Sequence, residues 1–175
     1  MSYCFPNGSI TRPLFSNPLE TFIGLRRNRH RTDTSFFFRK KGLETMDDRF
    51  TTVRNEVLTA SQLWITHFNN GDVDACVAGY LPDAVMEAKP MGTFKGTQEI
   101  DDFWRPFMSS GAKGLAYQEV TLKVINESTV HLSANWRMNV GHGVITLEKW
   151  LKQPNGQWLL AHDAFEVREQ FPQKQ

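Results

Sequence analysis

The sequence predicts an α+β protein in which a curved antiparallel sheet wraps around about three N-terminal helices. Apolar residues recur at helical spacings of three and four between Phe50 and Phe107, and at the strand spacing of two from Val120 onwards. Helices followed by a run of strands favour a fold whose helices cover one face of an antiparallel sheet. Because such a sheet twists, closing it over a long helix makes a cone with a central pocket.

The composition fits one globular domain. The chain has 175 residues, of which 40% are hydrophobic, and a net charge of +1, which is ordinary for a protein with a full core. Residues 1–45 hold eight Lys/Arg against three Asp/Glu, and the remaining residues hold twelve against sixteen. This mildly acidic body lacks the basic surface typical of nucleic-acid binding, and no apolar run is long enough to cross a bilayer. We therefore expect neither nucleic acid nor membrane as a partner.

Residues 1–45 differ from the rest of the chain. They combine turn-forming Pro and Gly with a basic cluster at 26–31 and keep no helical or strand period. We expect a disordered basic extension at 1–45, a domain at 46–171 and a short tail at 172–175. The extension resembles an organelle transit peptide in composition, and its basic cluster could also contact RNA or an anionic surface. We favour a dispensable extension upstream of an alternative start at Met46.

The two cysteines predict neither a disulfide nor a metal site. Cys4 and Cys76 lie in differently composed parts of the chain, and they do not have the spacing of metal ligands. The simplest expectation is a protein of a reducing compartment, the cytoplasm, that uses no metal and no cofactor.

Two helices are predicted at the start of the domain. The first begins at Met46, and its apolar face recurs every three or four residues: Phe50, Val53, Val57, Ala60, Trp64 and Phe68. The segment 69–71 (Asn-Asn-Gly) is a typical helix stop. Asp72 then caps a short second helix that we expect to reach Tyr80.

A hairpin around 90–92 leads from the second helix to a third. Thr97 is the expected N-cap of the third helix. Pro106 should kink or end this helix, because proline removes a backbone donor and clashes with the preceding turn. From Val120 the period changes to two, and the strand 130–139 separates fully into an apolar face and a polar face.

The last two predicted strands meet at 154–156 (Pro-Asn-Gly), where Asn-Gly is a strong signal for a tight hairpin. Beyond the turn, Asp163 lies next to His162 in an otherwise apolar strand. Neighbours in a strand face opposite ways, so one of these side chains should point into the pocket and the other outwards. A carboxylate inside must be solvated, paired or kept for chemistry.

Four segments resemble the nuclear transport factor 2-like superfamily, which includes SnoaL-like cyclases, ketosteroid isomerases and scytalone dehydratase. They are the end of the first helix at 68–72, the segments 80–85 and 92–100, and the closing segment 155–163. Their order and spacing are more specific than any one of them. The resemblance covers residues 46–170 and implies a cystatin-like cone fold. Members of the superfamily include enzymes, binding modules and oligomerisation domains, so function must come from the site.

The resemblance implies an acid/base site on the last strand. Asp163 stands where SnoaL-like cyclases carry an acid/base carboxylate, and an apolar cone would raise its pKa. His142, flanked by two glycines, resembles the neighbourhood of the second acid/base group, although two glycines also signal a simple bend. Ketosteroid isomerases carry a base on the first strand, where this chain has Ala88 and, one place early, Glu87. A steroid-type isomerase is therefore not expected unless Glu87 faces inward.

Further candidates for ligand binding are aromatic and histidine side chains: Trp64, Tyr80, Trp104, Trp136 and His162. The aromatic rings could line a pocket for a flat apolar ligand, or they could belong to an ordinary core. His162 could contact a ligand or be a hydrogen-bonded core residue.

Two functions remain open. The first is a small-molecule-binding cone that acts as a cofactor-independent lyase, isomerase or cyclase on a small hydrophobic carbonyl compound, with Asp163 as acid/base and His142 as its helper. The alternative is a non-catalytic ligand-binding or oligomerisation module of the same fold. In both cases we expect a homodimer formed through the sheets. A cavity shared by the side chains of Asp163 and His142 would favour the enzyme.

Overall fold

A computed structural model describes residues 45–172 of the chain, and it confirms the α+β prediction. The helices are α1 (Met46–Asn70), α2 (Val73–Ala78) and α3 (Gly96–Ser109). The strands are β1 (Tyr80–Lys89), β2 (Gly92–Lys95), β3 (Ala116–Asn126), β4 (Thr129–Met138), β5 (Gly141–Lys152) and β6 (Trp158–Gln170). Apart from Thr45 and Pro172, the predicted extension and tail lie outside the described residues.

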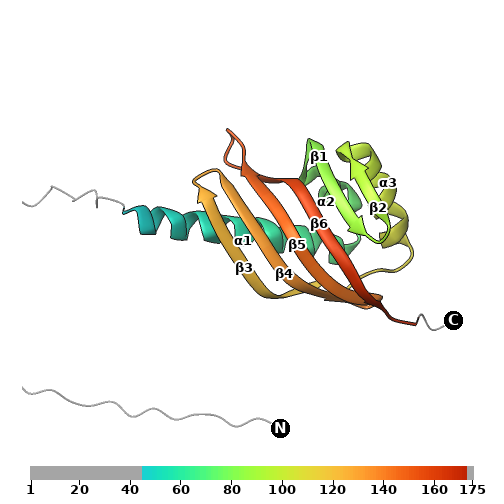
Figure 1. Cartoon of the computed structure of the whole chain (residues 1–175). Coiled ribbons are helices and arrows are strands. Elements are labelled where there is room, and N and C mark those ends of the chain that lie inside the picture. The colour runs from blue at the N-terminus through green and yellow to red at the C-terminus, as the bar shows by residue number, and fades with distance from the viewer. Residues whose placement is uncertain (1–44, 173–175) are drawn as a thin grey trace, which may run out of the picture. The chain divides into compact units, whose positions relative to one another are not determined.

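The strands form one curved sheet of six strands in the order β2-β1-β6-β5-β4-β3 (Figure 1). The pairing is antiparallel everywhere except between β1 and β6, which run parallel. The predicted curved antiparallel sheet thus contains one parallel pair. Parallel strands cannot be joined by a tight turn, and here the chain between them contains β2, α3 and the other three strands. This junction places the first strand beside the last.

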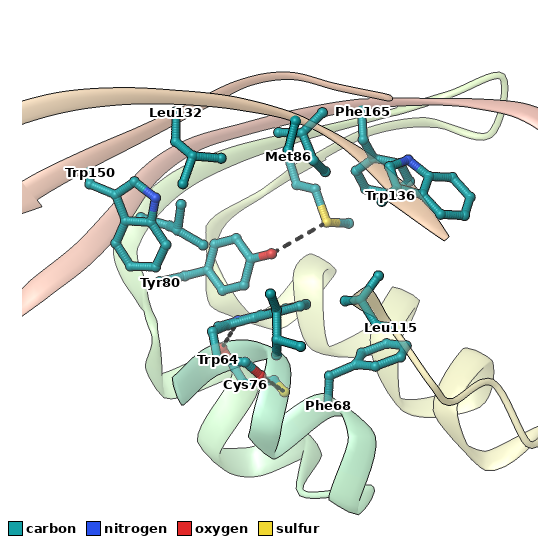
Figure 2. Packing of buried hydrophobic residues seen from close by; sticks show 14 of the residues in the cluster. Trp64, Phe68, Cys76, Tyr80, Met86, Leu115, Leu132, Trp136, Trp150 and Phe165 are labelled. Atoms are coloured by element: carbon teal, nitrogen blue, oxygen red, sulfur yellow. Dashed lines mark hydrogen bonds between the residues drawn. The ribbon is translucent and has the colours of Figure 1, made fainter. Parts of the chain in front are cut away.

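The helices cover one face of the sheet, with α1 lying across it and α2 and α3 behind the end formed by β1 and β2 (Figure 1). The core fills the space between them. Its fully buried side chains come from both layers, for example Phe68 of α1, Met86 of β1, Ile100 of α3 and Leu132 of β4. Figure 2 shows Tyr80 reaching from the start of β1 into this core, between the helices and the sheet.

The first helix has the predicted bounds because both of its ends are capped. The Thr45 side chain accepts a hydrogen bond from the backbone N–H of Asp48, whose carboxylate in turn accepts from the Thr45 N–H, so two otherwise unpaired donors are satisfied. At the other end Gly71 adopts the left-handed conformation with a φ of 76°, which glycine reaches without steric cost. None of the described helices is long and apolar enough to cross a membrane.

Three details of the helices differ from the predictions. The second helix ends at Ala78, so Tyr80 begins β1 rather than ending a helix. The third helix starts two residues earlier than a Thr97 cap would place it, with Lys95 as its N-cap and the Glu99 carboxylate accepting the Lys95 N–H at 2.6 Å. It also continues past Pro106 to Ser109, because a proline so near the end of a helix removes only one of its last hydrogen bonds.

Candidate functional site

A cavity of about 420 Å³ lies between the helices and the sheet. Its lining is rich in aromatic rings, which come from both layers: Trp64, Phe103, Trp104, Phe107, Tyr117, Trp136, Phe165 and Phe171. The rings also contact one another, as in the stacked pair of Trp104 and Phe165, whose centroids are 5.8 Å apart. The volume falls within the range of about 300–1,000 Å³ that is usual for small-molecule sites. Core side chains therefore do not fill the cone.

Asp163 of β6 is the one carboxylate among the described residues that line this cavity. Its side chain is only 4% exposed. The hydroxyl of Tyr80 donates a hydrogen bond of 2.7 Å to Asp163 Oδ2, and Trp104 Nε1 donates one of 3.2 Å to the Tyr80 oxygen. Asp163 Oδ1 is also buried, but it has no hydrogen-bond partner in the described part of the chain. Such an acceptor costs about 1–3 kcal/mol, so it needs an explanation.

A second buried carboxylate, Glu148 of β5, pairs directly with Asp163 across the two strands. It is 3% exposed. Glu148 Oε1 accepts a hydrogen bond of 2.7 Å from the Tyr117 hydroxyl, and Oε2 accepts one of 2.8 Å from Trp150 Nε1. Glu148 is absent from the cavity lining, whereas Tyr117 belongs to it. The carboxyl group of Glu148 is thus joined to the cavity through one phenol.

The surroundings raise the pKa of both carboxyl groups. Burial raises the pKa of Asp163 to about 6, although the hydrogen bond from Tyr80 acts in the opposite direction. Burial, and then the charge of Asp163, raise the pKa of Glu148 to about 8, against the hydrogen bonds from Tyr117 and Trp150. Since the groups interact, these values belong to the pair. Near neutral pH the pair therefore carries one negative charge and one proton.

Two β-bulges turn the carboxylates towards the helices. The extra residue is Ala161 in β6 and Thr146 in β5, so the pair of Glu148 and Asp163 lies between the two bulges. A bulge shifts the alternation of inward and outward side chains by one position. Leu160 and Asp163 are three residues apart and would face opposite ways in a regular strand, yet both are buried. The bulges thus place both carboxylates on the inner face.

Residues 62–170 match the family described as the SnoaL-like domain, and this match covers more than half of the chain. The chain belongs to the SnoaL-like domain family. No curated protein has significant sequence similarity to it.

Solved structures of low sequence identity share the fold of this SnoaL-like domain. A ketosteroid isomerase-like protein from Erwinia carotovora atroseptica has a TM-score of 0.57 at 15% identity, over 66% of this chain and 95% of its own. An NTF2-like protein with a cystatin-like fold from Novosphingobium aromaticivorans has a TM-score of 0.58 at 14% identity, over 73% and 93%. A protein of unknown function from Mycobacterium tuberculosis has a TM-score of 0.63 at 12% identity, over 73% of this chain and 79% of its own. At these identities the likeness concerns the fold alone.

The SnoaL-like domain does not bring His142 and Asp163 together. His142 Nε2 lies 3.0 Å from Glu169 Oε2, the His142 side chain is 38% exposed, and the residue does not line the cavity. The flanking glycines have a packing role instead. A Cβ atom on Gly143 would lie 2.7 Å from Cζ2 of Trp136, closer than van der Waals contact allows. The Gly-His-Gly segment is therefore explained by close packing, and the predicted His–Asp pair is not formed.

Of the other predicted residues, the aromatic ones lie at the cavity and His162 does not. Trp64, Trp104 and Trp136 line the cavity, and Tyr80 contacts it indirectly through its hydrogen bond to Asp163. His162 does not line the cavity, and its Nε2 lies 3.1 Å from Glu87 Oε1.

The pairing with His162 places Glu87 of β1 away from the cavity, and Ala88 beside it is fully buried. The base position of the steroid-type isomerases is therefore not filled by a carboxylate. The sequence reasoning missed Glu148 and Tyr117. The available signal was a lone acidic residue in the apolar strand 144–151, opposite Asp163 in the closing hairpin. Among residues 45–172, no group of His, Cys, Asp or Glu is arranged to hold a metal ion.

Proposed function

We propose that this protein is a cofactor-independent acid–base enzyme that isomerises, or eliminates a group from, a small hydrophobic carbonyl compound, with Asp163 as the general base. One observation carries the proposal: Asp163 Oδ1 is a buried carboxylate oxygen without a hydrogen-bond partner in residues 45–172, on a residue that lines an aromatic cavity. A carboxylate with a pKa raised to about 6 is largely ionised at neutral pH and is a stronger base than an exposed one.

The neighbouring groups suit this role. The hydrogen bonds from Trp104 to Tyr80, and from Tyr80 to Asp163 Oδ2, hold the carboxylate in one orientation, which leaves Oδ1 for a proton of the bound molecule. A C–H group next to a carbonyl is acidic enough for a positioned carboxylate to remove its proton. The flat aromatic walls favour a ligand that is itself flat and mainly apolar.

The test is deuterium exchange, because it detects proton removal without knowledge of the product. The full chain is incubated in D2O with 2-tetralone, cyclohex-2-enone or acetophenone, and the loss of the proton signal next to the carbonyl is followed by NMR. We expect exchange above the buffer rate, and a decrease of about 10²–10⁴-fold in Asp163→Asn, the usual contribution of a general base. His142→Ala, which changes an exposed pair, is the control and should keep the parent rate.

The alternative is a ligand-binding module without chemistry, which the mainly apolar lining of the cavity would also serve. The same probes separate the two functions. A probe that raises the melting temperature of both the parent and Asp163→Asn, but exchanges no proton in either, would support the binding module and contradict the enzyme.

We also infer that the protein forms a homodimer through the outer face of its sheet, as the sequence analysis expected. The centre of this face is partly apolar, with partly exposed Val144, Leu147, Leu151 and Leu159 on β5 and β6. Apolar side chains on an open sheet face are suited to cover by a second copy of the same surface.

A further inference from the structure

We propose that Glu148 is the second proton carrier of this site: it holds a proton beside Asp163 and delivers it to the bound molecule through the hydroxyl of Tyr117. This inference rests on the proposed role of Asp163 as the base. Removing a proton from carbon is only half of an isomerisation or elimination, because a second group must protonate another atom of the substrate. His142 was the sequence candidate for that group, but it lies away from the cavity.

Glu148 lies beside Asp163 on the neighbouring strand. It pairs directly with Asp163 in the β5–β6 register, and side chains opposite each other in an antiparallel pair have Cβ atoms about 4.5–5.5 Å apart. Both residues are almost fully buried. Their separate hydrogen bonds point to separate tyrosines: Tyr80 contacts Asp163, and Tyr117 contacts Glu148. The site therefore has two carboxyl–phenol units side by side.

No positively charged side chain in residues 45–172 compensates the charge of the two carboxyl groups. The titratable groups that face them are Tyr80 of β1 and Tyr117 of β3, whose own pKa values are raised by burial and by the two carboxylates. Trp104 and Trp150 donate neutral N–H groups. Among residues 45–172, no Lys, Arg or His forms an ion pair with either carboxylate. Two buried like charges without a cation do not both ionise, so a shared proton is the way to relieve their repulsion.

The proton steps balance. The Asp163 carboxylate takes the proton of a C–H group next to the carbonyl, and the electron pair of that bond moves to the carbonyl oxygen. The electron pair then returns from the oxygen as Tyr117 gives its hydroxyl proton to the second atom of the substrate, either a carbon that forms a new C–H bond or a hydroxyl group whose C–O bond breaks so that it leaves as water. When Glu148 is protonated, the 2.7 Å hydrogen bond runs from its hydroxyl to the Tyr117 oxygen, and this oxygen takes the Glu148 proton as Tyr117 gives up its own. Asp163 is then protonated and Glu148 ionised, and transfer of the proton from Asp163 back to Glu148 restores the starting state.

The proton on Glu148 can be observed without any turnover. In infrared spectra of the full chain near pH 7, a protonated carboxyl group gives a carbonyl band that carboxylates lack. We expect this band in the parent, its loss as the pH is raised above about 8, and its absence in Glu148→Gln. Asp163→Asn should keep the band because Glu148 stays buried, but should lose it at a lower pH than the parent, because the charge of Asp163 no longer raises the pKa of Glu148. A parent spectrum without the band, or a band that survives in Glu148→Gln, would overturn the inference.

Delivery of the proton is tested by the pH profile of a reaction that needs protonation of a second carbon, the isomerisation of cyclohex-3-enone to cyclohex-2-enone. Glutamine can accept the Trp150 N–H and donate to the Tyr117 oxygen, so Glu148→Gln keeps the packing but cannot release a proton. We expect kcat to fall by about 10²-fold or more with little change in KM, and the loss of activity above about pH 8 to disappear. Tyr117→Phe should lower kcat similarly while it keeps the infrared band.

The outcomes distinguish the two proposals. Full activity in Asp163→Asn removes the base and with it the proposed function. Parent-like activity and an unchanged pH profile in Glu148→Gln, with Asp163→Asn inactive, would leave the base in place and refute proton delivery by Glu148. If Glu148→Gln does not fold, Tyr117→Phe decides the matter, because its unchanged rate would have the same meaning.

Discussion

At the residue scale, the distinctive feature of the protein is a pair of acidic side chains that burial makes reluctant to ionise. The folded chain raises the pKa of Asp163 to about 6 and of Glu148 to about 8, whereas an unfolded chain leaves both near their usual values close to 4. Between about pH 4 and about pH 8 the folded state therefore binds more protons than the unfolded state. Proton binding is therefore linked to folding as well as to chemistry.

The stability of the protein should fall as the pH rises. The contribution of the two raised pKa values is fully present below about pH 4 and is lost as the pH passes about 6 and then about 8. With about 1.4 kcal/mol for each pKa step of one, we expect a decrease of the order of a few kcal/mol between pH 5 and pH 8.5, measured by urea unfolding. Glu148→Gln should lose most of this decrease. Glu169→Gln, an exposed control, should keep all of it.

A second residue-scale prediction concerns Gly143, which allows the Trp136 ring to pack on the sheet. In Gly143→Ala the added Cβ would press on that ring and on the backbone oxygen of Glu166. We expect a loss of about 1–3 kcal/mol in the free energy of unfolding. Gly156→Ala is the comparison, because no atom lies within 4 Å of its Cβ and only its φ of 88° is unfavourable. Equal losses in the two variants would show that the Trp136 contact does not limit this position.

At the element scale, the site depends on the β-bulges that interrupt the regular pairing of β5 and β6. In a regular strand the side chains of Asp163 and Leu160 would face opposite sides of the sheet. The bulge at Ala161 places both on the same side. The helices are held in a similarly specific way. The Asn69 side chain at the end of α1 accepts the Leu115 N–H at 2.7 Å and donates to the Leu115 carbonyl at 2.9 Å, and Leu115 lines the cavity.

Asn69→Ala should therefore loosen the contact between α1 and the segment before β3. It leaves two backbone groups of a nearly buried residue, Leu115, without their partners, which costs about 1–3 kcal/mol. Urea unfolding measures the total loss, and faster hydrogen exchange of the Leu115 amide would locate it. Asn70→Ala, at the exposed neighbouring position, is the control. A similar effect in both variants would point to helix propensity and not to the clamp.

The sequence alone predicts the helices of this protein better than it predicts the site. Periodicity was sufficient for the long helix, because Val57, Trp64 and Phe68 are buried as their spacing predicts. It was insufficient for the site, because the position of a bulge is set by the pairing of two strands and cannot be located from the spacing of one strand alone. Asp163 could therefore be proposed from its resemblance to known cyclases, but its direction could not. Glu148 was overlooked for the same reason.

At the scale of the whole molecule, the parallel junction between β1 and β6 joins the two ends of the domain. It brings Tyr80 next to Asp163, although 83 residues separate them. The site is thus assembled from the first strand, the last four strands and the helices. The outer face of the same sheet is the surface through which we propose that two copies associate.

If a second copy covers that face, Leu147→Arg should give a monomer that is still folded. The side chain lies on β5 beside Glu148 but faces away from the cavity, so the change adds a charge to the inferred interface and leaves the core intact. Light scattering after size-exclusion chromatography measures the mass, and circular dichroism checks the fold. A parent protein that is monomeric at micromolar concentration would contradict the homodimer.

The aromatic wall of the cavity also makes the protein its own optical sensor. Of the five tryptophans in the chain, Trp64, Trp104 and Trp136 line the cavity, and Trp150 donates its N–H to Glu148. Indole emission depends on the polarity and hydrogen bonding of its surroundings. A molecule that enters the cavity, or a proton that leaves Glu148, should therefore alter the intrinsic fluorescence, and ligands can be sought with no label and no assay of turnover.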